Sequence, residues 1–296
     1  MKRMIISYGC LAVAIWSCST LKYAANHEYP AADDGYTPQG RLEEVIYEPT
    51  EDGPSQRRML VYLPDGYDTS GKDYPVLYLL HGAKGNETSW INKGHILRDI
   101  DSLTRTGEME ETIVVFPNTN QYDDDKDFGK SRLKNMFESL FEMDGAVETA
   151  FMEDVVGTTD SMYRTIPDRT CRAIAGLSMG GLQTIRISAA FPDGFDYIGV
   201  FSPVIRTIVK HGKHSDFYRN LYGRLEVLFS DPPAEYIIMI GRNDILEPRI
   251  GSFICHLKRK GYGFDFYESS GGHSWYNWEN YCRFFMKTLW RFSGQR

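Results

Sequence analysis

The sequence predicts an α/β fold in which helices cover both faces of a mostly parallel central sheet. Three segments, 74–80, 112–116 and 235–240, are short and continuously apolar, as expected of strands buried on both faces. Helical patterns separate such segments along the chain, and strands that alternate with helices favour parallel crossover connections. A glycine-rich run, 173–181, joins one further apolar segment to a helical pattern.

The first two strands differ from the later ones. Segments 41–47 and 57–63 are rich in β-forming residues on either side of the turn 51–54 (Glu-Asp-Gly-Pro), which predicts an antiparallel pair. The remaining elements are expected as strands at 74–80, 112–116, 171–175, 197–201, 235–240 and 264–268, and as helices at 95–105, 149–163, 181–191, 253–260 and 278–292.

The N-terminal region predicts export. Two basic residues precede an apolar run, 4–16, that is too short for a stable membrane-spanning helix, so residues 1–18 are expected to form a secretory signal peptide. Residues 15–18 (Ile-Trp-Ser-Cys) resemble a bacterial lipobox except at Trp16, which makes Cys18 the candidate lipidation site. An ordinary signal peptide cleaved nearby is the alternative.

The domain organisation follows from this leader. Residues 19–40 carry Pro, Gly and Asp without sustained periodicity and are expected to form a tether. Residues 41–296 are long enough for one domain but tight for two. A lipid at Cys18 would hold this domain at a membrane while the domain itself stays water-soluble. We therefore expect an exported protein, anchored in the periplasm or at the cell surface.

Charge and cysteine content narrow the class of protein. A net charge of −7 without a dense basic run argues against a nucleic-acid-binding surface. Cys171, Cys255 and Cys282 lack the spacing of zinc ligands and are expected to be buried small side chains, although a Cys255–Cys282 disulfide stays open in an exported protein. Segment 121–148, first acidic and then amphipathic, is either a lid beside the substrate or a solvated surface helix.

The run 173–181 contains the pattern G-x-S-x-G of a nucleophile elbow, centred on Ser178. Side chains two residues before and after the serine would clash in so sharp a turn, which explains Gly176 and Gly180. The elbow would place the Ser178 hydroxyl at the N-terminus of a helix, where the Met179 N–H can face a developing oxyanion. The alternative is a strand-to-helix turn that binds nothing.

A nucleophilic serine needs a base and a third group that orients the base. Among the histidines that follow Ser178, His273 lies on a glycine-flanked loop just after a strand and is the predicted base, whereas His256 falls within a helical pattern. Asp244 directly follows the strand 235–240 and is the predicted acid. A helix N-cap is its alternative role, and Glu247 is the reserve candidate.

The second oxyanion donor is expected in the loop after the strand 74–80. The backbone N–H of Ala83 is placed for this role beside that of Met179. Gly82 permits close approach of the backbone there, and the His81 side chain is expected to be structural.

These stretches together resemble the esterase-D-like group of α/β-hydrolases, also called carbohydrate esterase family 1. The group includes feruloyl and acetyl-xylan esterases and is related to enterochelin esterases, S-formylglutathione hydrolases and mycolyltransferases. The resemblance spans about residues 41–292, whereas 121–148 matches no part of the pattern. The matching stretches are 74–82, 86–90, 173–181, 241–244 and 272–275, followed by Trp278.

The resemblance implies an α/β-hydrolase fold with Ser178, Asp244 and His273 as the catalytic triad, and neither a metal nor an organic cofactor. With the leader, it predicts an exported serine carboxylesterase that removes feruloyl or acetyl groups from polysaccharides. An acyltransferase of the mycolyltransferase type and a non-catalytic glycan-binding lipoprotein are the alternatives. Aromatic candidates for stacking on a sugar or phenolic ring, which could equally pack in the core, are Trp90, Trp275 and Tyr276.

Overall fold

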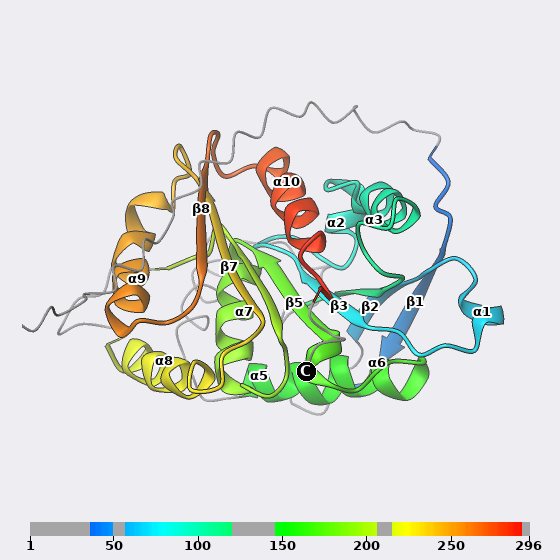
Figure 1. The fold of residues 1–296 in the computed structure, drawn as a ribbon, viewed down its shortest axis with the longest axis horizontal. Helices are drawn as coiled ribbons and strands as arrows, with labels where there is room; N and C mark the ends of the chain where they lie inside the picture. The colour runs from blue at the N-terminus through cyan, green and yellow to red at the C-terminus, as the bar shows by residue number, and fades with distance from the viewer. Residues whose placement is uncertain (1–35, 50–56, 120–145, 206–214, 292–296) are drawn as a thin grey trace, which may run out of the picture.

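The computed structural model describes residues 36–49, 57–119, 146–205 and 215–291, and within them the chain forms one eight-stranded sheet (Figure 1). Its strand order is β1-β2-β4-β3-β5-β6-β7-β8. β2 runs antiparallel to both of its neighbours, and every pair from β4 to β8 is parallel, as predicted. The strands are β1 (Arg41–Tyr47), β2 (Arg57–Leu63), β3 (Val76–Leu80), β4 (Ile113–Pro117), β5 (Arg172–Leu177), β6 (Tyr197–Phe201), β7 (Glu235–Gly241) and β8 (Asp265–Ser269).

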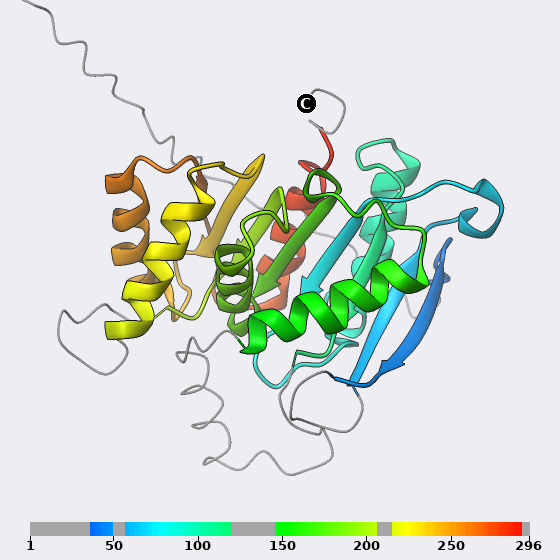
Figure 2. The same cartoon turned by 90° about the horizontal axis from the view of Figure 1, so that it is seen from below.

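Helices cover both faces of the sheet, which confirms the predicted layering. Figure 2 shows α5, α6, α7 and α8 in front of the strands, with α3 and α10 behind them. The helices are α1 (Tyr67–Ser70), α2 (Ser89–Asn92), α3 (Ile96–Arg105), α5 (Ala146–Ala150), a π-helical segment (Phe151–Val156), α6 (Gly157–Met162), α7 (Met179–Ala190), α8 (Ser215–Leu228), α9 (Glu247–Lys260) and α10 (Trp275–Met286), with a 3₁₀ turn at Arg169–Cys171.

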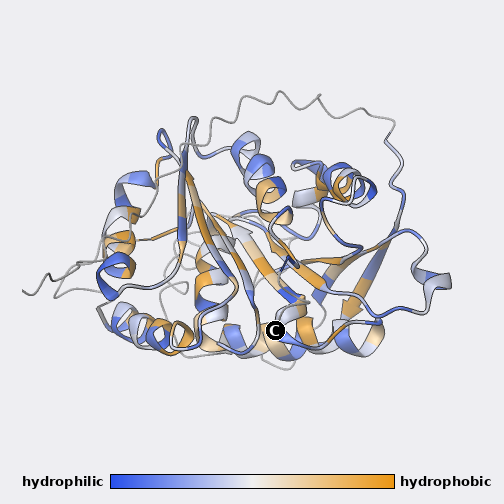
Figure 3. Ribbon diagram, viewed as in Figure 1, coloured by the Kyte–Doolittle hydropathy of each residue, from blue (hydrophilic) through white to orange (hydrophobic). Residues whose placement is uncertain are grey.

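Each buried strand supplies apolar side chains to two cores. In β3 the alternate residues Val76, Tyr78 and Leu80 belong to one cluster, with side chains of α7, α8 and α9, while Leu77 and Leu79 belong to the other, with side chains of α3 and α10. Figure 3 shows the apolar strands enclosed between helices whose outer faces are hydrophilic. Burial on both faces is the physical reason for the continuous apolar runs in the sequence.

Several helices differ from the prediction. α8 was missed, although four of its side chains, Phe217, Tyr218, Leu221 and Leu225, are buried at helical spacing. α9 begins at Glu247 rather than at residue 253, because a proline in the first turn does not interrupt a helix. α10 begins at Trp275 rather than at residue 278 and ends at Met286.

Cys255 and Cys282, which the sequence left open as a possible disulfide, are not bonded to each other, since both cysteines are free. Cys255 is exposed on α9 and Cys282 is a buried residue of α10, and these two helices pack on opposite faces of the sheet. Cys171 is half-buried, so only Cys282 is the fully buried small side chain that was expected.

Several predictions lie outside the described residues: the signal peptide at 1–18, Cys18, most of the tether at 19–40, and nearly all of segment 121–148. Among the helices that are described, none combines the length and the apolar character needed to cross a membrane.

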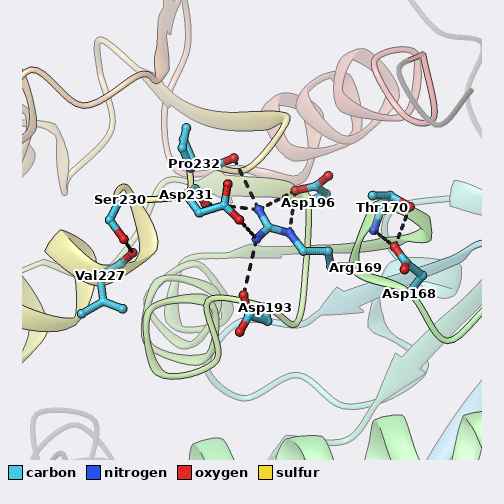
Figure 4. A network of polar contacts seen from close by, with 9 residues as sticks. All are labelled: Asp168, Arg169, Thr170, Asp193, Asp196, Val227, Ser230, Asp231 and Pro232. Atoms are coloured by element: carbon cyan, nitrogen blue, oxygen red, sulfur yellow. Dashed lines mark hydrogen bonds and ion pairs between the residues drawn. The ribbon is translucent and has the colours of Figure 1, made fainter. Parts of the chain in front are cut away.

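A network around Arg169 ties together the amino ends of three neighbouring strands (Figure 4). Arg169, just before β5, lies 2.7 Å from Asp196, which precedes β6, and 2.9 Å from Asp231, which lies ahead of β7. Asp193 joins the cluster at 3.6 Å. This cluster holds the strand starts in register at the edge of the sheet opposite the carboxyl ends of the strands.

Candidate active site

Ser178 sits in a sharp turn between β5 and α7. Its backbone has φ 56° and ψ −111°, a conformation that residues with side chains rarely adopt. The Ser178 N–H donates to the Phe201 carbonyl at 2.8 Å, and the Val204 N–H donates to the Ser178 carbonyl at 3.0 Å. The end of β6 therefore holds this turn in place, with Ser178 at the N-terminus of α7.

Two glycines allow the turn to form, as the pattern predicts. A Cβ atom on Gly176 would lie 2.4 Å from the Gly180 carbonyl oxygen, and one on Gly180 would lie 2.5 Å from the His81 carbonyl oxygen. Both contacts are with backbone atoms, which cannot move aside without displacing β3 or α7.

Three side chains from separate loops meet at the carboxyl edge of the sheet. His273, between β8 and α10, places Nε2 3.0 Å from Ser178 Oγ. Its Nδ1 lies 3.0 Å from both carboxylate oxygens of Asp244, which follows β7. The structure thus brings the three candidate residues into one hydrogen-bonded row, in the chain order serine, acid, histidine.

Asp244 is buried, yet its surroundings keep it ionised. Burial raises the pKa of its carboxyl, but hydrogen bonds from His273, from the Leu246 N–H and from Ser202 outweigh burial and hold that pKa below its usual value. Asp244 is not the helix N-cap, because Leu246 occupies that position in α9. Glu247, the reserve candidate, is the first residue of the helix, and His273 bonds to Asp244 instead.

The ionised Asp244 determines the tautomer of His273. A carboxylate only accepts hydrogen bonds, so Nδ1 must carry the imidazole proton and donate it. Nε2 then presents a lone pair to the Ser178 hydroxyl and can take its proton. Trp278 packs edge-on against the His273 ring, with centroids 4.8 Å apart, and restricts its rotation.

Sequence reasoning missed a further polar residue, Ser202. It directly follows β6, is fully buried and has φ 45°. Its N–H donates to the Met239 carbonyl at 2.8 Å, and its side chain bonds to the Asp244 carboxylate. The available signal was its position, since a serine directly after a buried strand stands at the same sheet edge as Ser178 and Asp244.

Two backbone N–H groups stand beside this row. Met179 begins α7, and Ala83 lines the adjoining cavity. Within the described residues neither N–H has a hydrogen-bond acceptor. His81 Nδ1 lies 2.8 Å from the Gly82 carbonyl, and its Nε2 accepts from the Thr119 N–H at 3.1 Å. Because the Gly82 carbonyl and the Ala83 N–H belong to one planar peptide, His81 also fixes the direction of that N–H.

A cavity of about 850 Å³ opens in front of Ser178 and His273. A space of this size accommodates a small ester with a short or aromatic acyl group. Its apolar wall consists of Leu177, Val204, Ile205, Ile245, Leu246, Trp275 and Trp278.

The three aromatic candidates for substrate contact lie in different surroundings. Trp275 lines the cavity, whereas Tyr276 is 46% exposed and is not among the lining residues. Trp90 is 1% exposed, donates its indole N–H to the Leu80 carbonyl at 3.1 Å and packs edge-on against Trp275. Trp90 is therefore a core residue that does not line the cavity, which agrees with the alternative of core packing.

The chain matches known esterases over most of its length. A family model described as "Putative esterase" matches residues 52–242. The curated protein "Endo-1,4-beta-xylanase/feruloyl esterase" of Xylanibacter ruminicola is 32% identical over 191 residues, which are 61% of this chain and 25% of that protein. The chain thus spans a quarter of the length of this relative. "Endo-1,4-beta-xylanase Y" of Acetivibrio thermocellus is 28% identical over 63% of this chain and 16% of its own length.

A solved structure has the same fold. The CE1 ferulic acid esterase of the anaerobic fungus Anaeromyces mucronatus superimposes with a TM-score of 0.70 and 23% identity, covering 88% of this chain and 94% of that one. This likeness confirms the predicted α/β-hydrolase fold. The family match ends before Asp244 and His273, so their placement beside Ser178 rests on the geometry described above. The resemblance to an esterase family and the predicted class, an ester hydrolase, are thereby confirmed. Since the match extends over more than half of the chain, the protein belongs to this esterase family.

Proposed function

We propose that this protein is a serine ester hydrolase that removes feruloyl or acetyl groups from polysaccharides. The observation that carries the proposal is the hydrogen-bonded row from Ser178 through His273 to Asp244, with both contacts at 3.0 Å. A serine hydroxyl is a poor nucleophile at neutral pH, and such a row supplies the base and the orienting group that it needs.

Acylation is the first half of the proposed reaction. Ser178 Oγ attacks the ester carbonyl carbon while His273 Nε2 takes the hydroxyl proton. The N–H groups of Met179 and Ala83 donate to the oxyanion that forms. His273 then passes its proton to the alcohol oxygen as the C–O bond breaks, and an acyl-serine remains. Asp244 stays ionised throughout and stabilises the imidazolium.

Deacylation repeats these steps with water as the nucleophile. His273 takes a proton from the water molecule, whose oxygen attacks the acyl carbon. Collapse of the second oxyanion breaks the bond to Oγ, and Ser178 recovers its proton from His273. The products are a carboxylic acid and the alcohol released in the first half.

The names of the relatives and the cavity wall support the choice of substrate. The relative from Xylanibacter ruminicola and the fungal structure are both named for feruloyl or ferulic acid ester cleavage. Trp275 and Trp278 offer aromatic surface beside Ser178, against which a feruloyl ring can pack.

The test compares hydrolysis of methyl ferulate and p-nitrophenyl acetate by the purified protein and by Ser178→Ala. We expect the variant to keep the wild-type circular dichroism spectrum and to lose at least about 10³-fold in kcat. Preference for methyl ferulate indicates a feruloyl esterase, and cleavage of the acetate alone indicates a deacetylase. Unchanged turnover in Ser178→Ala contradicts the serine mechanism, and no turnover by the wild type favours the non-catalytic glycan-binding hypothesis.

We also propose that the protein is exported and carries a lipid on Cys18. The support is the sequence of residues 1–18, which lie outside the described part of the chain. Metabolic labelling with an alkyne-bearing palmitate should mark the wild type and leave Cys18→Ser unmarked. Equal labelling of both proteins would contradict lipidation at this residue.

A further inference from the structure

Three basic side chains line the cavity in front of Ser178. Lys84 lies in the loop after β3, Lys93 follows α2, and Arg249 lies on α9. No aspartate or glutamate is among the described residues that line this cavity. The wall therefore carries positive charge in a protein whose formal net charge is −7.

The protein leaves these three cations without a partner of opposite charge in its described part. By contrast, Lys260 at the other end of α9 lies 3.5 Å from Glu226, an ion pair away from the cavity. All three side chains are exposed, so they act on an anionic ligand through a positive field that salt screens over about 10 Å at 0.1 M.

The position of Arg249 has no structural explanation in its own helix. It lies in the first turn of α9, where the helix dipole disfavours a positive charge. The Arg249 side chain is exposed, so it contributes little to the packing of the core. A basic residue in such a position is better explained by a ligand than by the stability of the helix.

Lys93 and Arg249 each lie beside an apolar part of the cavity lining. Gly94, next to Lys93, packs so closely on Trp275 that a Cβ atom would lie 3.0 Å from its ring. Arg249 follows Leu246 by one helical turn, and its N–H donates to the Leu246 carbonyl at 3.0 Å. A ligand that fits this lining has an apolar part and an anionic group.

We propose that the substrate is an ester that carries a carboxylate, which Lys93 and Arg249 bind while Lys84 adds to the positive field. The inference rests on the proposed esterase function and narrows its substrate class to anionic esters. Acyl groups on a glycan that contains uronic acid, and monoesters of dicarboxylic acids, both have this chemistry.

Two matched pairs of chromogenic esters test the inference and locate the carboxylate. For the acyl side the pair is 4-nitrophenyl hydrogen glutarate and 4-nitrophenyl pentanoate. For the alcohol side it is 5-acetoxy-2-nitrobenzoate and 4-nitrophenyl acetate. We expect kcat/KM of the anionic member of one pair to exceed that of its neutral partner by at least about ten-fold at low salt. The preference should fall as the salt concentration rises to about 0.5 M.

Variants identify the groups responsible. In Lys93→Gln/Arg249→Gln the ratio of anionic to neutral kcat/KM should fall to near one. Lys258→Gln/Arg259→Gln removes the same two charges, one lysine and one arginine, from exposed positions of α9 that do not line the cavity, and should keep the wild-type ratio. Lys84 is not substituted, because it adjoins the oxyanion donor Ala83.

The outcomes separate this inference from the esterase function. Serine-dependent hydrolysis with equal kcat/KM within both pairs overturns the anionic substrate and leaves the esterase standing. If the wild type cleaves none of the four esters, the binding of unreactive anilides tests the inference. Tryptophan fluorescence measures this binding. Tighter binding of glutaric acid mono-4-nitroanilide than of pentanoic acid 4-nitroanilide, lost in the double variant, supports the anion site, and equal binding overturns it.

Discussion

The indole N–H of Trp278 donates to the hydroxyl oxygen of Ser202 at 3.2 Å, and this bond determines where the Ser202 proton can point. Because the oxygen already accepts from the indole, its own O–H is directed to the Asp244 carboxylate. The same tryptophan packs edge-on against His273. Ser202 thus positions the acid of the candidate triad, and Trp278 positions both Ser202 and the base.

Ser202→Ala is expected to lower kcat about ten-fold while KM changes little. The hydroxyl holds Asp244 and not the substrate, and a hydrogen bond to a charged group contributes about 1.5–3 kcal/mol. Steady-state kinetics on p-nitrophenyl acetate measures the change. Ser202→Cys, which keeps a weak donor, should recover part of the lost kcat.

Ser202→Gly separates the hydroxyl from the strained backbone of this residue. Glycine adopts the φ of 45° at this position without strain, so this variant should unfold at a higher urea concentration than Ser202→Ala. Its kcat should nevertheless be as low as that of Ser202→Ala. Wild-type kcat in either variant would contradict the positioning role.

Gly180→Ala is expected to lower the free energy of unfolding by about 1–3 kcal/mol, because its Cβ atom would overlap the backbone of β3. Urea denaturation measures the loss. Gly223→Ala in α8 is the matched control, since no heavy atom lies within 4 Å of its added Cβ atom. That variant should be about 0.5–1 kcal/mol more stable than the wild type. Equal stability of the two variants would mean that the elbow has room for a side chain.

The ion pair between Glu148 and Arg186 joins α5 to α7 inside the protein, with the Oε1 and Nε atoms 2.6 Å apart and both side chains almost fully buried. Arg186→Met should cost about 3–5 kcal/mol of unfolding free energy, because Glu148 is left as an uncompensated buried charge. The double variant Glu148→Leu/Arg186→Met removes both charges and should recover most of this loss. A double variant as unstable as the single one would show that the arginine acts through packing.

Stability should also depend on pH through Glu235. Burial, and next the charge of Asp265, raise the pKa of Glu235 from 4.5 to about 7. The folded chain binds this proton more tightly than the unfolded chain, so the stabilisation is complete below pH 4.5 and is lost as the pH rises through about 7.

Glu235→Gln should therefore match the wild type at about pH 4 and be more stable at about pH 8, because glutamine does not ionise. Urea denaturation at the two pH values measures the difference. Glu110→Gln, at an exposed position, is the control for the loss of one negative charge. A constant difference between Glu235→Gln and the wild type across this range would contradict the raised pKa.

Local patterns were sufficient for most strands and for the elbow. Strands such as β6, at Tyr197–Phe201, agree with the prediction because burial on both faces leaves a continuous apolar run. The clash that requires Gly176 involves Gly180, which is close in the chain, so the short motif already contains it, whereas the clash at Gly180 is with Leu80 and His81 of a distant segment. His273 and Asp244 could be selected because each follows a strand on a short loop.

Contacts between distant segments were not predictable in this way. Ser202 depends on Asp244 and Trp278, which lie far along the chain, and no short pattern marks such a partner. Trp90 was a candidate for substrate contact because its type suits that role, but the packing of Trp275 and Phe201 around it places it in the core.

By itself the sequence determined the order of the strands, the mostly parallel sheet and the candidate nucleophile, because these depend on periodicity and on a short motif. Only the tertiary structure decided which side chains meet at the carboxyl edge of the sheet, that Cys255 and Cys282 lie on opposite faces, and that Lys93 and Arg249 share one cavity. The physical reason is that strand pairing and helix packing bring together residues whose separation along the chain carries no information about their distance in space.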